Sequence, residues 1–275
     1  MDPDELHRVA LRMLADYDAG RPNEIFAEHG TDWLTLDDAY AVQRALAELR
    51  RARGERLIGY KVGCVGAAIQ HQFGLHEPVR GYVWAIESHH SGCHLSHTRF
   101  ANLAIEGEIA LRVSHDIPPD ILNDGGDFDD LCDCVDCWFP VIELHNYVFR
   151  GAVPTSQELV AGNAMHAGFV ASPFPTNHSV ATIRNAEIQV ELQGDRLETN
   201  KLSSLWGGLG PLRSLSWLVA SLASTRELLK AGDIVLTSSP ERLIRINASC
   251  VVAVTCEGMR VEFLVADVGA FSGPA

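Results

Sequence analysis

No stretch of this chain is apolar for long enough to cross a membrane. A spanning helix needs about 18 or more apolar residues in a row, and the 275 residues contain no such run. The N-terminus, Met1-Asp2-Pro3-Asp4-Glu5, is acidic and lacks the apolar core of a signal peptide. We therefore expect a cytoplasmic protein with no membrane partner.

Positive charge is also scarce. The chain has 22 Lys and Arg against 36 Asp and Glu, which gives a formal net charge of -14 at pH 7. Because nucleic-acid binding needs a basic surface, we expect no nucleic-acid partner. A small anionic substrate stays compatible with this charge, since local cations or a metal ion can reverse the field inside a cleft.

The cysteines lack the pattern of a disulfide framework. Seven is an odd number and no export signal accompanies them, so we expect no structural disulfides. Three of them, Cys132, Cys134 and Cys137, resemble half of a zinc site, but a structural zinc ion needs four ligands. We interpret this segment as a helix with a short apolar stripe, formed by Leu131, Val135 and Trp138.

Two further patterns fall short of a known site. The histidines of segment 89–97, beside Cys93, lack a zinc-finger spacing and indicate a polar loop. The run Gly207-Gly208-Leu209-Gly210 lacks the Lys and Ser or Thr that follow in a phosphate-binding loop.

The chain does contain helical and strand patterns, without an internal repeat. Apolar spacing predicts helices over 4–17, from Thr35 onward, over 67–73 and over 212–230. Alternating runs predict strands, which are 57–62, 103–113, 139–145, 187–193, 233–238, 249–256 and 259–265. Segment 75–100, rich in Gly, His and Pro, predicts a domain boundary or a long connection.

Three carboxylates on two of these strands point to a site. Glu106 and Glu108 share one face of their strand, because successive side chains alternate, and Glu143 shares a face with His145 on the next predicted strand. Acidic groups on apolar strands are costly to bury unless something neutralises them, and a divalent cation would do so. The alternative is a solvated strand face.

The order of several short motifs resembles a known family. They are Thr35-Leu36-Asp37-Asp38-Ala39-Tyr40-Ala41-Val42-Gln43, Ile58-Gly59-Tyr60-Lys61-Val62-Gly63, Gln72-Phe73-Gly74, Glu77-Pro78, Ile105-Glu106-Gly107-Glu108-Ile109-Ala110, Ile142-Glu143, Asn163-Ala164, Gly207-Gly208, Pro211, Trp217-Leu218 and Ala231-Gly232-Asp233. Together, over roughly residues 31 to 265, they resemble the 2-keto-4-pentenoate hydratase and 4-oxalocrotonate decarboxylase branch of the fumarylacetoacetate hydrolase superfamily.

The resemblance implies an α+β fold of the fumarylacetoacetate hydrolase type. Its bent, mixed β structure would form a catalytic region over 86–275, beside a smaller helical α/β region over 1–85. It also implies Mg²⁺ or Mn²⁺ bound by Glu106, Glu108 and Glu143, a small 2-oxo acid substrate, and a homo-oligomer, either a dimer or a ring of dimers. A third glutamate favours this branch over the hydrolases, which usually have an Asp there.

Lys61 is implied to reach the active site. Glycines on either side leave space around it, and it could hold a substrate carboxylate or enolate, or move a proton if its pKa is lowered. Without the family match, a surface lysine would be the simpler interpretation.

The sequence departs from the family pattern in three places. Val79 stands where hydratases usually carry a second acid, Gly162-Asn163-Ala164-Met165-His166 replaces Asp-Asn-Ala-Ser-Ser, and Ser238-Ser239 replaces a Gly-Ser pair. These positions shape the substrate pocket in relatives, so the substrate and the reaction are less constrained than the metal.

Two histidines could compensate. His145 could be an added metal ligand, which would shift preference toward Mn²⁺, Fe²⁺ or Zn²⁺, or a general acid or base, or a hydrogen-bonded core histidine. His166 has a similar set of options. Arg80 could bind a substrate carboxylate or lie at the surface, and Asn163 and Ala164 are candidate substrate contacts by resemblance.

Three functions follow from this reading. The first is a metal-dependent hydratase that adds water to a short 2-hydroxy-dienoic or 2-oxo-enoic acid. The second is a decarboxylase of a 2-oxo-3-enedioate, which needs the same electron sink and no attacking water, and which the missing acid at Val79 slightly favours. The third is a non-catalytic family member that serves as a partner subunit.

Overall fold

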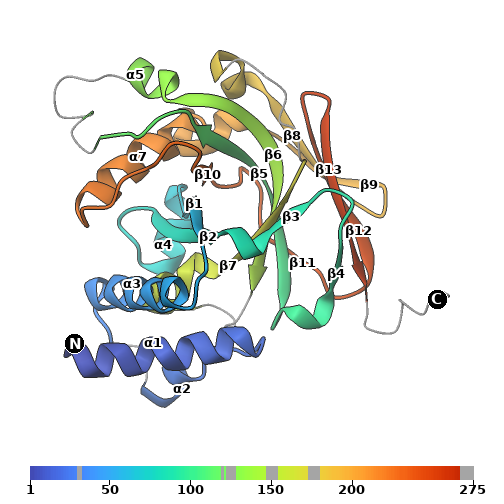
Figure 1. Cartoon of the computed structure of the whole chain (residues 1–275). Helices are drawn as coiled ribbons and strands as arrows, with labels where there is room; N and C mark the ends of the chain where they lie inside the picture. Colours follow the sequence, from blue (N-terminus) through green and yellow to red (C-terminus); the bar gives the residue numbers. More distant parts are fainter. Residues whose placement is uncertain (30–32, 119–120, 122–127, 147–153, 173–179, 267–275) are drawn as a thin grey trace.

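Two β-sheets form the frame of the molecule, and helices cover one end and one side (Figure 1). The computed structural model describes residues 1–29, 33–118, 121, 128–146, 154–172 and 180–266. The larger sheet has the order β2-β1-β10-β5-β6-β7-β3, with β11 paired to β5, and the smaller has the order β4-β13-β12-β8-β9.

The larger sheet holds the long central strands. Its members are β1 (Leu57–Gly63), β2 (Val79–Trp84), β3 (Ser88–His90), β5 (Leu103–Val113), β6 (Val135–Asn146), β7 (His166–Ala171), β10 (Ile234–Leu236) and β11 (Ile244–Arg245). The smaller sheet consists of β4 (His94–Ser96), β8 (Glu187–Leu192), β9 (Asp195–Lys201), β12 (Cys250–Cys256) and β13 (Met259–Ala266). Parallel pairing of β1 with β10 and of β3 with β7 makes the larger sheet mixed.

Helices pack around this frame. They are α1 (Pro3–Asp18), α2 (Ile25–His29), α3 (Leu36–Ala52), α4 (Ala67–Phe73), α5 (Phe128–Asp133), α6 (Ser156–Ala161) and α7 (Leu212–Ala223). The pairs α1–α3 and α3–α6 lie against each other and form the N-terminal layer in Figure 1, with their own apolar cluster. Helix α7 buries Leu215, Leu218 and Leu222 in the main core.

The two sheets approach closely at Gly107 on β5. A Cβ atom there would lie 2.7 Å from Cγ2 of Val190 on β8 and 3.2 Å from Cγ2 of Val254 on β12. Glycine at this point lets the smaller sheet pack directly behind the strand that carries Glu106 and Glu108.

The structure confirms much of the predicted α+β organisation. Helix α3 starts at a capping box in which the Thr35 hydroxyl accepts from the Asp38 N–H and Asp38 accepts from the Thr35 N–H. Helix α4 ends where Gly74 adopts a left-handed conformation. The strand predicted over 103–113 has these bounds in β5.

Other predictions were wrong. Helix α7 ends at Ala223 instead of residue 230, because the chain turns at Arg226 (φ 59°) and Leu229 is buried through a bridge to Ile117. The helix proposed for the Cys132–Cys137 segment also ends early, at Asp133, and its second half begins β6. In both segments the apolar side chains have helical spacing by coincidence, because they are buried in chain that is not helical.

Segment 75–100 contains β2, β3 and β4, which the sequence pattern did not reveal, and β7 and β9 were also missed. Strands β1 and β2 precede the boundary proposed near residue 85, yet they belong to the same sheet as β5. The division into regions 1–85 and 86–275 is still a prediction. Among the described residues, no helix is both long and apolar enough to span a membrane.

Candidate metal centre and active-site cavity

Glu106 and Glu143 face each other across the antiparallel strands β5 and β6, where they are direct partners in the register. Like charges at such a position repel, because paired side chains lie within a few ångströms. Glu143 is fully buried, whereas the Glu106 side chain keeps 18% of its surface exposed. The pair therefore spans from the protein interior to an open space and needs a compensating positive charge.

His145 completes a compact cluster with these two glutamates. Its Nε2 atom lies 3.0 Å from Glu106 Oε2 and 3.4 Å from Glu143 Oε2. Each of the three residues offers one ligand atom, and these atoms all lie within 4.8 Å of one another. Such spacing suits a shared cation, and among the described residues this is the one group of His, Cys, Asp and Glu side chains that meets it.

Glu108, the third predicted metal ligand, lies outside the cluster of Glu106, Glu143 and His145. It is fully buried, and its Oε2 accepts the Ser238 N–H at 3.1 Å. Burial, followed by the charges of Glu143 and Glu106, raises the pKa of Glu108 well above its usual range. The surroundings of Glu108 therefore disfavour its charged form, although it shares the strand face of Glu106.

Glu143 and His145, which are also buried, both carry charge. Burial alone would raise the pKa of Glu143, but Lys61 and His145 hold the pKa well below its usual range. Burial alone would lower the pKa of His145, but Glu143 and Glu106 raise that pKa to about 9. The metal-free centre is thus a network of compensating charges.

Lys61 extends from β1 into this network. Its Nζ lies 3.4 Å from Glu143 Oε1 and donates to the Ala164 carbonyl at 3.3 Å. A Cβ atom on Gly63 would lie 3.1 Å from this Nζ, so the glycine leaves room for the ammonium group, as expected. Burial lowers the pKa of Lys61, but Glu143, Glu108 and Glu106 outweigh it and raise the pKa above its usual value. Lys61 is therefore cationic in the metal-free centre. This charge favours the expected role of holding a substrate carboxylate or enolate over that of moving a proton, which needs a lowered pKa.

The residues present fit a bound cation. Four buried atoms of the centre lack a hydrogen-bond partner, namely Glu108 Oε1, Glu143 Oε2 and both ring nitrogens of His145. Buried polar atoms are normally satisfied. Carboxylate and imidazole atoms turned toward one another without hydrogen bonds are the donor set that a divalent cation takes.

The centre lies in a cavity of about 620 Å³. Lys61, Glu106 and His145 contribute its charged part. The apolar wall comes from α4, β2, α6 and the turn before β7, and consists of Ala68, Ile69, Phe73, Val79, Leu159, Ala164 and Met165. Its polar lining also includes the segment after β10, with Ser238, Ser239, Glu241, Arg242 and Arg245. This volume is typical of small-molecule sites.

A strained turn supports the apolar wall. Asn163, Ala164 and Met165 all have positive φ angles, of 56°, 52° and 64°. Such angles are costly for residues other than glycine and persist only where the surroundings hold them. The Asn163 side chain does so by accepting the Tyr82 N–H at 2.7 Å and donating to the Tyr82 carbonyl at 2.9 Å. Asn163 thus positions the wall, and Ala164 faces the cavity.

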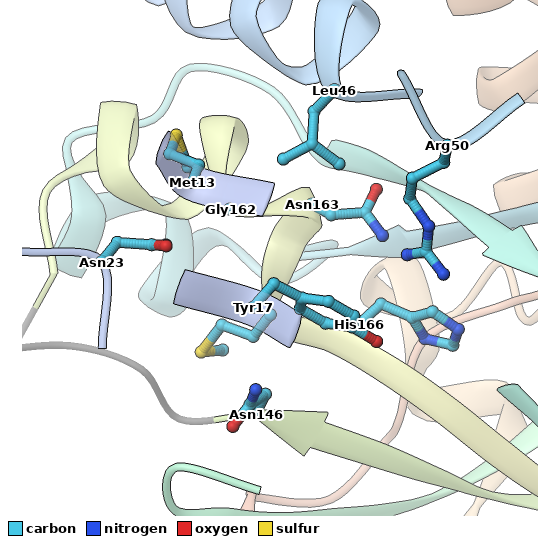
Figure 2. Close-up of a pocket in the computed structure, with 10 residues that line it drawn as sticks. Met13, Tyr17, Asn23, Leu46, Arg50, Asn146, Gly162, Asn163 and His166 are labelled. Carbon is cyan, nitrogen blue, oxygen red and sulfur yellow. The ribbon is translucent and has the colours of Figure 1, made fainter. Parts of the chain in front are cut away.

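His166 lies behind the centre. Its Nδ1 is 2.6 Å from Glu143 Oε1, on the carboxylate oxygen that His145 does not contact. Its Nε2 is buried without a partner and borders a second, small cavity of about 30 Å³, which Tyr17, Asn146 and Asn163 also line (Figure 2). His166 therefore orients Glu143 from outside the substrate space.

The structure does not bring Arg80 to the cavity. Neighbouring residues of β2 point to opposite sides, and Val79 takes the cavity side. The Arg80 guanidinium is instead bound to Glu227 at 3.2 Å and to Thr225 at 3.0 Å, beyond the end of α7. Its predicted role in substrate binding gives way to a structural one.

Glu241 is a cavity residue that the sequence analysis missed. It follows Ser238-Ser239 by two residues, so the departure from the family's Gly-Ser pair marked the right segment. The signal was an acid beside a recognised pocket motif, but no strand or helix pattern indicated that its side chain turns inward.

Comparisons with known proteins place the fold. A solved 4-oxalocrotonate decarboxylase from Pseudomonas putida G7, complexed with magnesium and adipate, aligns with a TM-score of 0.85 at 20% identity and covers 96% of this chain and 98% of that chain. Fumarylpyruvate hydrolase from Pseudomonas aeruginosa, in complex with Mn²⁺ and pyruvate, aligns with a TM-score of 0.58 at 15% identity over 77% of this chain and 90% of that chain. The α+β fold is of the fumarylacetoacetate hydrolase type, as predicted.

Curated sequences give a more specific resemblance than the fold alone. The 2-keto-4-pentenoate hydratase of Paraburkholderia phymatum is 27% identical over 221 residues, which are 80% of this chain and 82% of that protein. A 4-oxalocrotonate decarboxylase of Pseudomonas putida is 22% identical over 226 residues, 82% of this chain and 83% of that protein. The predicted resemblance to this branch is confirmed. No model of a protein family matches the chain.

Proposed function

We propose that this protein is a divalent-metal-dependent hydratase that adds water to a short 2-hydroxy-dienoic or 2-oxo-enoic acid, of the 2-hydroxypenta-2,4-dienoate type. The observation that carries the proposal is the cluster of Glu106, Glu143 and His145, with Lys61 beside it, in a cavity of small-molecule size. Several of the curated relatives are named as hydratases of such acids.

The metal would be Mg²⁺ or Mn²⁺, the ions named with the two solved neighbours. Glu106 and Glu143 would hold it with His145, and Glu108 would join them on giving up its proton. When bound, such an ion supplies a Lewis acid for the substrate's carboxylate and 2-oxygen.

Lys61 supports the chemistry through its fixed charge. The Nζ atom is buried and is held between the Glu143 carboxylate and the Ala164 carbonyl, so it needs no reorganisation when negative charge develops on the substrate. Electrostatic preorganisation of this kind is usually a large contribution to catalysis. We assign Lys61 to binding the substrate's carboxylate or enolate oxygen.

The cavity walls would orient the carbon chain. Val79, Leu159 and Met165 give an apolar surface for the unsaturated carbons, and Ser238 and Ser239 provide hydroxyl groups in the same cavity. The apolar surface would exclude water, which would approach the substrate from the hydroxyl groups.

The Glu106→Gln variant tests the proposal. The metal-stripped wild type, reloaded with Mg²⁺ or Mn²⁺, should consume 2-hydroxypenta-2,4-dienoate with loss of its ultraviolet absorbance. The variant should lose on the order of 100-fold or more in kcat/KM. Full activity of the variant in the presence of a chelator would refute a metal-dependent hydratase.

A decarboxylase is the second candidate. Two observations favour it, namely the valine at position 79 in the cavity wall and the TM-score of 0.85 to a decarboxylase. An assay of the same protein with a 2-oxo-3-enedioate, which follows CO₂ release, separates the two reactions. A non-catalytic partner subunit would bind Mn²⁺ and turn over neither substrate.

We also propose that the protein works as a homo-oligomer in the cytoplasm. The resemblance to curated enzymes of this branch supports both points. Light scattering of the purified protein tests the first point, and cell fractionation tests the second.

A further inference from the structure

Glu241 lies on the segment between β10 and β11 and lines the active-site cavity. The segment is anchored on both sides of the acid. Ser238, with a φ of 80°, donates its N–H to Glu108, and Ser239 accepts the Glu241 N–H through its hydroxyl at 3.0 Å. The carboxyl group is therefore placed by backbone contacts that reach the metal centre itself.

The Glu241 carboxyl group has no internal role in the fold. Both oxygens are buried, and neither makes a hydrogen bond of good geometry, although the Asn200 side chain interacts with the carboxyl group. The neighbouring cation, Arg242, is 2.7 Å from Glu198 on β9, and no ion pair involves Glu241 in the part of the chain that the structure describes. A buried acid that stabilises nothing around it calls for a functional explanation.

The groups that face Glu241 come from two strands. Glu198 and Asn200 lie on β9, and Glu106 lies on β5. Burial first, and then the negative charge of Glu198, raise the pKa of Glu241 to about 7, with a smaller contribution in the same direction from Glu106 and an opposing one from Asn200. A group with this pKa can both take up and release a proton near neutral pH.

We propose that Glu241 is the proton-transfer group for the distal carbons of the substrate, in place of the acid that hydratases of this branch carry at the position of Val79. Val79 and Glu241 line the same cavity, so an acid at either position borders the substrate space. Other candidates for this proton transfer have different roles. Lys61 is paired with Glu143, and Glu106 and His145 belong to the metal centre. This inference rests on the proposed hydratase function.

The step balances as the addition of one water to a 2-oxo-3-enoate. One O–H bond of water breaks while its oxygen forms a bond to carbon 4, and the proton passes to the Glu241 carboxylate. The electron pair of the C3=C4 bond shifts toward carbon 3, which leaves an enolate with its charge on the 2-oxygen, near Lys61. Glu241 then returns the proton to carbon 3, so that a C–H bond forms, the 2-oxo group is restored and the carboxylate is regenerated.

The isosteric variant Glu241→Gln tests this role. We expect kcat to fall by about 100-fold with little change in KM, because general acid–base groups contribute roughly 10²- to 10⁴-fold. The limb of the pH–rate profile near pH 7 should vanish, while Mn²⁺ affinity by calorimetry and the thermal unfolding temperature stay at wild-type values. Glu241→Asp should recover part of the rate and keep the limb.

Glu198→Gln is the matched control. It removes a neighbouring negative charge and frees Arg242, so the limb should move to lower pH without disappearing. Infrared spectra provide a readout that needs no turnover: the Mn²⁺-loaded wild type should show a protonated-carboxyl band that titrates near pH 7 and that Glu241→Gln lacks.

Three results would overturn the inference. If Glu241→Gln keeps the wild-type rate and pH profile, Glu241 is not the proton-transfer group and the hydratase function still stands. If the variant loses Mn²⁺ binding or thermal stability together with activity, its role is structural. If the wild type releases CO₂ from a 2-oxo-3-enedioate but leaves the dienoate unchanged, the proposed function fails and the role of Glu241 in hydration falls with it.

Discussion

His145 on β6 is the direct cross-strand partner of His166 on β7, and the two imidazoles contact different oxygens of one carboxylate, that of Glu143. His145 belongs to the cluster of metal-ligand atoms, and His166 does not. One histidine can therefore bind the ion while the other holds the ligand between them, an arrangement in which an outer partner orients a ligand. This difference makes the pair a natural comparison for mutagenesis.

We predict that the protein binds Mn²⁺ more tightly than Mg²⁺. An imidazole donor favours transition-metal ions over Mg²⁺, which prefers oxygen ligands. The ratio of the two dissociation constants, measured by calorimetry, should shrink by about tenfold in His145→Asn. His166→Asn should weaken both ions similarly, since it disturbs only the orientation of Glu143. An unchanged ratio in His145→Asn would show that the ligands are carboxylates alone.

Metal binding should release protons. At pH 7.5 the metal-free centre holds a proton on His145, whose pKa is raised to about 9, and the pKa of Glu108 is raised as well. The ion displaces the imidazole proton, so its apparent affinity should increase with pH up to about 9. Calorimetry in buffers of different ionisation enthalpy counts the protons, and a count of zero at pH 7.5 contradicts the charge state described above.

The same titration should affect the stability of the metal-free protein. The folded-state pKa of His145 is raised from 6.5 to about 9, so its contribution to stability is fully present below pH 6.5 and is lost as the pH rises through about 9. Thermal unfolding temperatures should fall across that window. His145→Asn should flatten the dependence, and a wild-type curve that is flat over this window would count against the buried ion pairs.

Removal of the Lys61 charge should separate binding from turnover. Lys61→Met keeps much of the side-chain volume but leaves Glu143 and its neighbours without their internal cation. We expect Mn²⁺ to bind more tightly, because it has less positive charge to oppose it, and kcat/KM to fall by on the order of 100-fold. A variant with weaker Mn²⁺ binding would indicate that Lys61 supports the site structurally.

Gly107→Ala should force the two sheets apart. The new methyl group would meet Val190 Cγ2 at 2.7 Å, and valine has little rotamer freedom to move away. Overpacking of this kind costs about 1–3 kcal/mol in the free energy of unfolding. Urea denaturation measures the loss, and Val190→Ala in the same chain should recover part of it; equal stability of Gly107→Ala and the wild type would show that the sheets adjust freely.

The sequence predicted the centre better than it predicted the cavity. Strand parity placed Glu106 with Glu108, and Glu143 with His145, on shared strand faces, because successive side chains alternate. The family resemblance joined the three glutamates into one site, and the register of β5 and β6 pairs Glu106 with Glu143. The sequence could not show that Glu108 is sealed by Ser238, which lies 130 residues later in the chain and meets it through β10 pairing. Nor could local patterns distinguish Arg80 from Val79, since the choice of side depends on which face of β2 the helices cover.

The errors in secondary structure have a common cause. Leu229, Val135 and Trp138 fit a helical apolar spacing, but a bridge to Ile117 buries Leu229, and pairing with β5 buries Val135 and Trp138 in a strand. Strands such as β7 begin directly after an irregular turn and contain Gly168 at a φ of 133°, so no alternation marks them. Contacts distant in sequence decide these segments.

In the turn at Asn163–Met165, the first residue fixes the backbone and the next two line the cavity. Asn163 ties the backbone to β2, and Gly81 leaves the room this requires, since a Cβ there would lie 2.6 Å from the Asn163 carbonyl oxygen. The next two side chains, Ala164 and Met165, line the substrate space on a backbone whose conformation Asn163 already holds. New substrates can therefore be reached by exchanging single side chains on a fixed loop, which makes this short turn a ready starting point for evolution or redesign of the enzyme's substrate range.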